Sequence, residues 1–277
     1  MAKQIRKGIA ALLALICCIS LVRLGLQWRD QKNGTAAYEN AAALAQSTQP
    51  TLPPATEPAE TEPVETAPPE PVWIPAPIEG EDPVLTALAS TDLAALREIN
   101  PDVVGWIHIP NSRVNYPLMQ GEDNTFYLEH TWEGVPNFYG SIYLESRNSP
   151  DLTDFNTIVY GHNMLDGSMF SMLSDYAYDW FRTWNPYVYI VSDAGILRYE
   201  VFSSYLAPID SPTYGLSFNQ MATREEFIAH ALESSEIQTG ITPAVTDRIL
   251  TLSTCTGVSY DSRRVVHAYL KMIPLEE

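Results

Sequence analysis

One cysteine stands where a nucleophile would be expected. Cys255 ends an apolar run that begins at Thr251, and a turn containing Gly257 follows it. The other two cysteines, at 17 and 18, lie in an apolar N-terminal run, so the rest of the chain has no disulfide framework. A lone thiol is more often a small buried residue than a reactive one. The position at a strand end favours the reactive thiol, because catalytic side chains gather where loops leave a rigid scaffold.

His162 occupies the same kind of position. A β-branched run over residues 156–160 ends at Gly161 and delivers His162 into a loop. A solvated loop histidine would have the same surroundings. The other four histidines, at 108, 130, 230 and 267, fall in predicted strands or helical segments. His162 is therefore the best-placed partner for the thiol.

Two arginines follow the cysteine at a distance that allows the chain to turn back. Arg263 and Arg264 come eight and nine residues after Cys255 and open a run of valines. Side chains alternate between the faces of a strand, so only one of the two arginines can point at the thiol. The alternative is a surface pair that solubilises a strand end.

Together, a cysteine, a histidine and an arginine indicate acyl transfer through a thioester. A free thiol has a pKa of about 8.5, and a neighbouring imidazole or guanidinium favours its thiolate form. Arginine stays cationic and offers directed donors to the oxyanion of a tetrahedral intermediate. Histidine can protonate a leaving amine and then deprotonate an incoming one.

Short strands must position these side chains. Eight β-branched or aromatic runs bounded by Gly, Pro, Asn or Asp predict a mainly β, α+β domain built on a closed or nearly closed barrel. The runs are 105–110, 114–119, 141–144, 157–160, 187–191, 196–205, 249–254 and 264–270.

Helices are predicted before and between the strands. N-terminal helical segments begin near residue 84, with Asp92 as the cap of the second segment. Met169–Trp180 is a further candidate. The capping box Thr223-Arg224-Glu225-Glu226 predicts a helix before the cysteine strand.

The N-terminal third predicts a membrane anchor and a spacer. Residues 1–33 contain basic residues, an uncharged run from Gly8 to Val22, then Arg23 and Trp28, which is typical of a signal anchor with the N-terminus inside. A cleaved secretory peptide is the alternative. Residues 34–84 are interpreted as a Pro/Glu/Thr-rich extracellular linker, and 85–277 as the catalytic domain.

Charge excludes one class of partner. After residue 33 the chain carries ten basic and 33 acidic residues. Such a field repels phosphate backbones, so a nucleic-acid partner is not expected. The histidines are scattered and the domain has no second cysteine, so no metal site is evident.

Several motifs resemble those of the sortase family. They are the segment Thr251–Cys255, the Arg-x-Val-Val at 263–266, and Tyr160-Gly161-His162-Asn163-Met164. The segments 100–107 and 140–144 resemble class B sortases in particular. The resemblance covers nearly all of residues 85–273.

This resemblance implies an eight-stranded sortase-type β-barrel with N-terminal helices and a helix before the cysteine strand. It also implies a cysteine transpeptidase that cleaves a C-terminal sorting signal of secreted proteins through a thioacyl intermediate. The chain released from the enzyme would be joined to an amine of a peptidoglycan precursor or a pilin subunit. No cofactor is implied, and the sequence does not identify the sorting signal.

The resemblance assigns roles to individual residues. Cys255 would be the nucleophile, His162 the acid and base, and Arg263 the oxyanion group, with Arg264 as a departure from the usual pattern. The substrate-groove residues would be Asn124, Leu128, Tyr160 and Ser253. A hydrolytic cysteine peptidase of another fold, or a non-catalytic wall-binding module, remains as an alternative.

Overall fold

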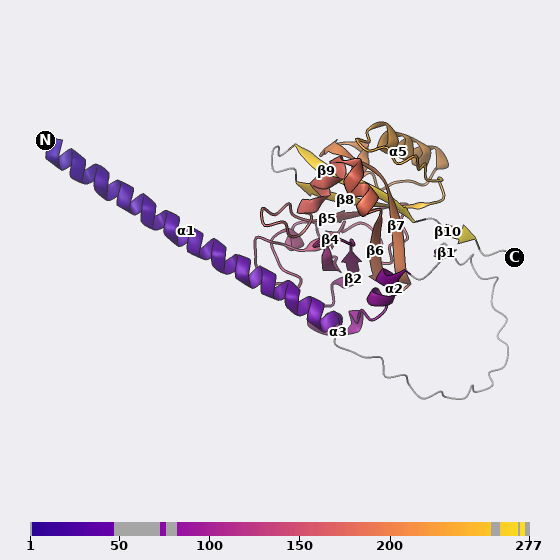
Figure 1. The fold of residues 1–277 in the computed structure, drawn as a ribbon, viewed down its shortest axis with the longest axis horizontal. Coiled ribbons are helices and arrows are strands. Elements are labelled where there is room, and N and C mark those ends of the chain that lie inside the picture. Colours follow the sequence, from indigo (N-terminus) through magenta and orange to yellow (C-terminus); the bar gives the residue numbers. More distant parts are fainter. Residues whose placement is uncertain (1, 47–72, 76–81, 256–260, 271, 275–277) are drawn as a thin grey trace, which may run out of the picture.

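The computed structural model describes residues 2–46, 73–75, 82–255, 261–270 and 272–274. Eight strands close into a barrel in the order β2-β3-β4-β5-β8-β9-β7-β6, with β2 and β6 paired to complete it (Figure 1). The pairs β3–β4 and β5–β8 are parallel. The barrel strands are β2 (Val103–His108), β3 (Asn115–Met119), β4 (Ile142–Leu144), β5 (Asn156–Tyr160), β6 (Tyr187–Ser192), β7 (Gly195–Pro208), β8 (Arg248–Cys255) and β9 (Ser262–Leu270). The predicted barrel and its eight strands are confirmed.

One long helix, α1, and several shorter helices accompany the strands. A further pair of short strands, β1 (Trp73–Pro75) and β10 (Met272–Pro274), is antiparallel. The helices are α1 (Ala2–Ala45), α2 (Pro83–Leu88), α3 (Leu93–Ile99), η1 (Phe126–Leu128), η2 (Ser171–Ala177), α4 (Asp179–Trp184), η3 (Pro212–Tyr214) and α5 (Met221–Glu233). Asp92 caps α3 as predicted, because its side chain accepts a hydrogen bond from the Ala95 amide at 2.9 Å.

Two helix predictions need correction. The single helix predicted over Met169–Trp180 is a 3-10 helix followed by α4, and the two are separated at Tyr178, whose backbone is extended. Met169 itself has a φ of 53°, which a right-handed helix does not allow. The helix before the cysteine strand is present, but it begins at Met221. The hydroxyl of Thr223 donates to the Gln220 carbonyl and therefore does not cap it.

Strand alternation divides the core between two faces of the sheet. On β8, Leu250 and Leu252 belong to the large cluster that fills the barrel. Ile249 faces outward and packs in a second cluster with Phe227 and Ala231 of α5. Residues 251, 253 and 255 share the outward face with Ile249, because side chains alternate along a strand.

The end of α1 packs on the barrel. Ala37, Ala41 and Ala45 are buried, and the Trp132 indole donates to the Ala37 carbonyl at 2.9 Å. Residues 34–45, within the predicted linker, are therefore helical and part of the hydrophobic core. Residues 47–72 and 76–81 of that linker lie outside the described residues.

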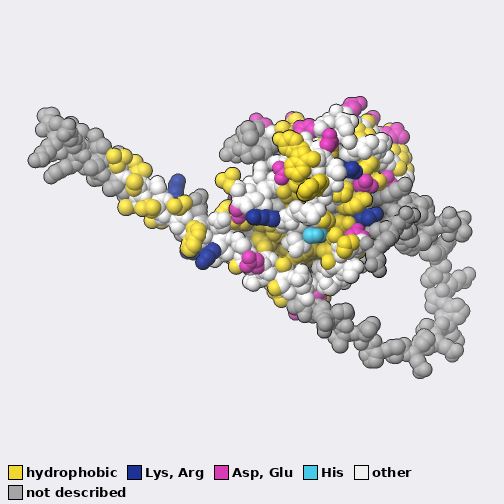
Figure 2. Space-filling view, in the orientation of Figure 1, with side chains coloured by type: hydrophobic (Ala, Val, Ile, Leu, Met, Phe, Trp, Pro, Cys, Tyr) yellow, Lys and Arg dark blue, Asp and Glu magenta, His cyan; other side chains and the backbone are white. Residues whose placement is uncertain are grey.

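The membrane anchor predicted within residues 1–33 is not supported. Among the helices of the described part of the chain, none is long and apolar enough to cross a membrane. Figure 2 shows Lys and Arg side chains among hydrophobic ones on the coloured part of α1.

Candidate active site

Three neighbouring strands bring the predicted chemical residues to one end of the barrel. β8 lies between β5 and β9 in the sheet. On one side, Tyr160 of β5 is paired with Ser253 of β8, and on the other, Cys255 is paired with Arg263 of β9. The Cys255 side chain lies outside the described part of the structure, so its place in this row follows from its backbone. Directly paired residues share a face of a sheet, so Arg263 lies on the face of Cys255.

His162 extends the same row. The Gly161 amide donates to the Ser253 carbonyl at 3.2 Å, which continues the pairing beyond the end of β5. One further residue along, His162 comes level with Cys255. Adjacent strands lie about 4.8 Å apart, so Cys255 and Arg263 on β8 and β9, and His162 two residues beyond the end of β5, form one row.

Gly161 is needed where the chain leaves β5 for His162. A Cβ atom at this position would lie 2.4 Å from Ile142 Cδ1 and 2.7 Å from Phe170 Cδ2. His162 is half-buried, and its Nε2 lies 2.7 Å from the Leu128 carbonyl oxygen. Its own carbonyl accepts from the Phe170 amide at 2.8 Å. These contacts hold the histidine loop against η1 and the start of η2.

The two arginines have different surroundings. The Arg264 side chain is 8% exposed, and its Nη1 donates to Glu236 Oε2 at 2.7 Å. It lies on the face opposite to Cys255, because it is paired with Thr254. Arg263 is half-buried at the barrel end, and its Nη1 donates to the Ser262 carbonyl at 3.0 Å. Alternation thus leaves Arg263, and not Arg264, on the face that the backbone pairing assigns to Cys255.

The four predicted groove residues surround this row. Leu128 reaches His162 through its carbonyl, and Ser253 precedes Cys255 on the same face. Tyr160 lies between Ser253 and β4, where its ring is 5.4 Å from that of Tyr143. Asn124 joins them indirectly, because it and Tyr160 bind the same carboxylate oxygen, that of Glu145.

Comparison with known proteins identifies the family. The sortase domain model matches residues 107–271. Sortase B of Listeria monocytogenes is 35% identical over 179 residues, which cover 63% of this chain and 72% of the relative. The Staphylococcus aureus sortase B–substrate complex is 32% identical with a TM-score of 0.61, over 66% of this chain and 85% of that one. Clostridium perfringens sortase B has the same identity and TM-score, over 66% of this chain and all of that one.

This chain belongs to the sortase family. Its named relatives are sortase B proteins, so the predicted resemblance to class B is confirmed. Sortases are cysteine transpeptidases, and the prediction of an enzyme of that kind is confirmed with the family. The alternatives of an unrelated peptidase fold and of a non-catalytic module are thereby set aside.

Two side chains that contact the predicted groove residues were missed from the sequence. Tyr214 of η3 reaches over the sheet, and its hydroxyl lies 3.1 Å from Ser253 Oγ. Glu145, which follows β4 directly, is 1% exposed. Burial raises the pKa of Glu145, but hydrogen bonds from Arg147, Tyr160 and Asn124 outweigh burial and hold the pKa below its ordinary value. A carboxylate at the end of an apolar strand was the available signal.

A chain of buried polar side chains links β5, β8, β9 and β7. Thr251 Oγ1 donates to Asn156 Oδ1 at 2.6 Å and lies 2.9 Å from His267 Nδ1. His267 Nε2 lies 3.1 Å from the Tyr205 hydroxyl, which lies 2.7 Å from Thr213 Oγ1. Burial lowers the pKa of His267 to about 3. This histidine is therefore a neutral structural group, which agrees with the choice of His162 as the partner of the thiol.

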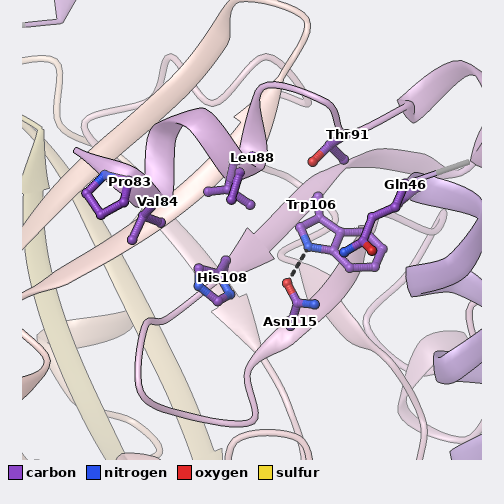
Figure 3. A pocket seen from close by; sticks show the side chains of 10 residues that line it. Gln46, Pro83, Val84, Leu88, Thr91, Trp106, His108 and Asn115 are labelled. Carbon is purple, nitrogen blue, oxygen red and sulfur yellow. Dashed lines mark hydrogen bonds between the residues drawn. The ribbon is translucent and has the colours of Figure 1, made fainter. Parts of the chain in front are cut away.

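A separate pocket lies away from these residues. It occupies about 300 Å³ between the end of α1, α2 and β2 (Figure 3). Trp106 forms part of its wall and donates from its indole to Asn115 Oδ1 at 2.8 Å. None of the seven predicted site residues lines this pocket.

Proposed function

We propose that this sortase cleaves a C-terminal sorting signal of secreted proteins and joins them to an amine of a peptidoglycan precursor or a pilin subunit. In this reaction the Cys255 thiolate attacks a backbone carbonyl of the signal. The C–N bond breaks, the leaving amine takes a proton from His162, and a thioester to Cys255 remains. An incoming amine then attacks the thioester, gives its proton to His162, and releases the thiolate as the C–S bond breaks.

The row of residues 162, 255 and 263 across three paired strands carries this proposal. A thiol needs a neighbouring proton-transfer group and a fixed positive charge to perform acyl transfer. The register of β5, β8 and β9 supports both, because it sets the backbone of His162 on one side of Cys255 and that of Arg263 on the other. Arg263 would donate to the oxyanion of each tetrahedral intermediate.

Two solved relatives support the choice of substrates. One is a sortase B–substrate complex of Staphylococcus aureus, and another is a sortase B complexed with triglycine. Triglycine is a peptide with a free α-amine and little steric bulk around it. An amine of that kind is a suitable acceptor for a thioester at Cys255, the last residue of β8. Secreted proteins and wall or pilin amines as partners would place the reaction at the cell surface.

Mass spectrometry of the reacting full-length chain tests the proposal. The purified protein is incubated with a library of sorting-signal peptides and with triglycine, beside Cys255→Ala. We expect a thioacyl adduct on Cys255 that partitions to a peptide–triglycine product, and neither species with the variant. Hydrolysis without transfer to the amine would indicate a peptidase instead. A thiol that forms no adduct with any peptide would contradict the proposed function.

A further inference from the structure

A buried carboxylate sits beneath the proposed substrate groove. Glu145 is 1% exposed, and its Oε2 accepts two hydrogen bonds, from Asn124 Nδ2 at 2.7 Å and from the Tyr160 hydroxyl at 3.0 Å. Its Oε1 lies 2.7 Å from Nε of Arg147, whose side chain is 71% exposed. The carboxylate thus binds two half-buried side chains, Asn124 and Tyr160, and one exposed cation, Arg147.

The contact with Glu145 decides what the Tyr160 hydroxyl can offer a ligand. A tyrosine hydroxyl has one hydrogen to donate and can also accept. The ionised carboxylate is acceptor-only and takes the single hydrogen. The Tyr160 oxygen therefore meets a ligand as a hydrogen-bond acceptor.

The orientation of Asn124 is fixed in the same way. Its Oδ1 accepts from the Ser146 amide at 2.8 Å, and its Nδ2 donates to Glu145. The amide group cannot turn over without losing both bonds. Because an amide nitrogen carries two hydrogens, one remains for a ligand, so Asn124 meets it as a donor.

These two groups lie close to the reacting row. Tyr160 precedes His162 by two residues, and its strand partner Ser253 precedes Cys255 by two. Two residues of strand span about 7 Å, which is also the repeat of an extended peptide. A backbone N–H and a backbone C=O are the complementary groups that such a peptide presents.

We propose that Glu145 is a positioning residue that fixes which side chains of the groove donate hydrogen bonds to the substrate and which accept them. Tyr160 accepts a hydrogen bond from a backbone N–H of the substrate. Asn124 donates to a backbone or side-chain oxygen of the substrate. This inference rests on the proposed function, because it assumes an extended peptide next to Cys255. The ionised state that it requires agrees with the lowered pKa of Glu145.

Tyrosine NMR tests the hydrogen bond without any substrate. The full-length protein is labelled with tyrosine ¹³C at Cζ, and Tyr160→Phe assigns the resonance among the 15 tyrosines. Glu145→Leu removes both acceptor oxygens and fills the buried space with an apolar side chain. We expect the Tyr160 resonance to shift at neutral pH and its titration to move to lower pH. Burial, the charge of Glu145 and the hydrogen bond to it raise the pKa of Tyr160, and the variant removes the last two causes. An unshifted resonance and titration in Glu145→Leu would overturn the inference.

An ester scan tests the polarity. In a sorting-signal peptide that the wild type turns over, each backbone N–H is replaced in turn by an ester oxygen, which can no longer donate. With the wild type, we expect one ester position to raise KM about tenfold or more, the effect of losing one hydrogen bond within an ordered site. In Glu145→Leu that penalty should fall below about threefold, because the Tyr160 hydroxyl is then able to donate to the ester oxygen. In Tyr160→Phe it should also fall below about threefold, because phenylalanine has no oxygen that would repel the ester oxygen.

The variants also separate positioning from general damage. With the unmodified peptide, Glu145→Leu should raise KM about tenfold while kcat stays within about twofold, and Glu145→Gln should recover most of the KM because it keeps one acceptor oxygen. Glu122→Gln is the matched control, since Glu122 is an exposed carboxylate two residues before Asn124, and it should behave as the wild type.

Equal ester penalties in the wild type and Glu145→Leu would overturn the inference. A wild type that turns over no peptide would instead overturn the proposed function, and the NMR result would then decide the inference by itself.

Discussion

Methionine substitutions of the two adjacent arginines of β9 separate their roles. Methionine keeps an unbranched apolar chain of similar girth but has no charge and no donors. In Arg263→Met we expect kcat to fall about 10²–10³-fold, the usual loss for one oxyanion donor, or ~3 kcal/mol of transition-state stabilisation. The stability of this variant should change by less than ~0.5 kcal/mol, because Arg263 is only half-buried.

The opposite result is expected for Arg264→Met. The Arg264 side chain is 8% exposed, whereas its partner Glu236 is 39% exposed. Water already reaches the carboxylate that would be left, so the cost should be ~1 kcal/mol, below the ~3–5 kcal/mol of breaking a fully buried pair. For a domain of this size, that cost corresponds to a fall in Tm of about 2–4 °C. The kcat should stay within about threefold of the wild type.

Both quantities are measured on the same two proteins. Initial rates of peptide transfer to triglycine give kcat, and a thermal melt gives Tm. The iodoacetamide alkylation rate of Cys255 adds a third comparison, because a nearby guanidinium favours the thiolate. A low kcat in Arg264→Met beside a nearly normal Arg263→Met would refute the assignment of faces from the β8–β9 register. Equal losses in both variants would refute the separation of roles.

Three further changes test the framework of the site. Gly161→Ala should cost ~1–3 kcal/mol and lower kcat, because its Cβ would meet Ile142 and Phe170 at less than 3 Å; a melt and initial rates check both. His267→Gln should flatten the loss of stability on acidification, seen in urea midpoints at pH 7 and pH 4. The folded pKa of His267 lies at about 3, below its ordinary value near 6.5, so the unfolded chain binds a proton first and stability falls as pH drops through that window. Ala41→Asp should lower Tm and expose α1 to limited proteolysis, because it buries an unpaired carboxylate.

The strands could be predicted from local sequence, whereas the helices could be predicted only in part. Each barrel strand is a β-branched or aromatic run between turn residues, and alternation along β9 was enough to predict that the two arginines point to opposite faces. Met169–Trp180 was predicted as one helix, but Met169 has a positive φ and the extended Tyr178 ends the 3-10 helix before α4. Phe170 and Tyr176 of this segment are fully buried, so tertiary packing acts on its backbone as well as local propensity. Periodicity does not record such packing.

The end of α1 shows a second limit of local reasoning. Apart from Tyr38, residues 34–45 bury alanines, which carry too little apolar surface to be recognised as part of a core. One of their partners is Trp132, whose indole donates to the Ala37 carbonyl across 95 residues of sequence. Small side chains are what allow the helix to approach the tryptophan closely. A segment can thus be core because its partner is large, although its own composition is that of a linker.

The candidate site shows the same limit of local reasoning for function. The positions of Cys255, His162 and Arg263 follow from strand ends and from the order of strands, so family motifs and alternation suffice to nominate them. Glu145 gains its role only from the fold, since its partners Asn124 and Tyr160 come from a loop and from β5. A carboxylate that is 1% exposed would be unfavourable without those donors. The Glu145 carboxylate has three such donors, from Arg147, Tyr160 and Asn124. Its hydrogen bonds to Tyr160 and Asn124 restrict which hydrogen-bonding groups the groove can present to a peptide. Substrate selection in this sortase therefore depends on a residue that need not touch the substrate.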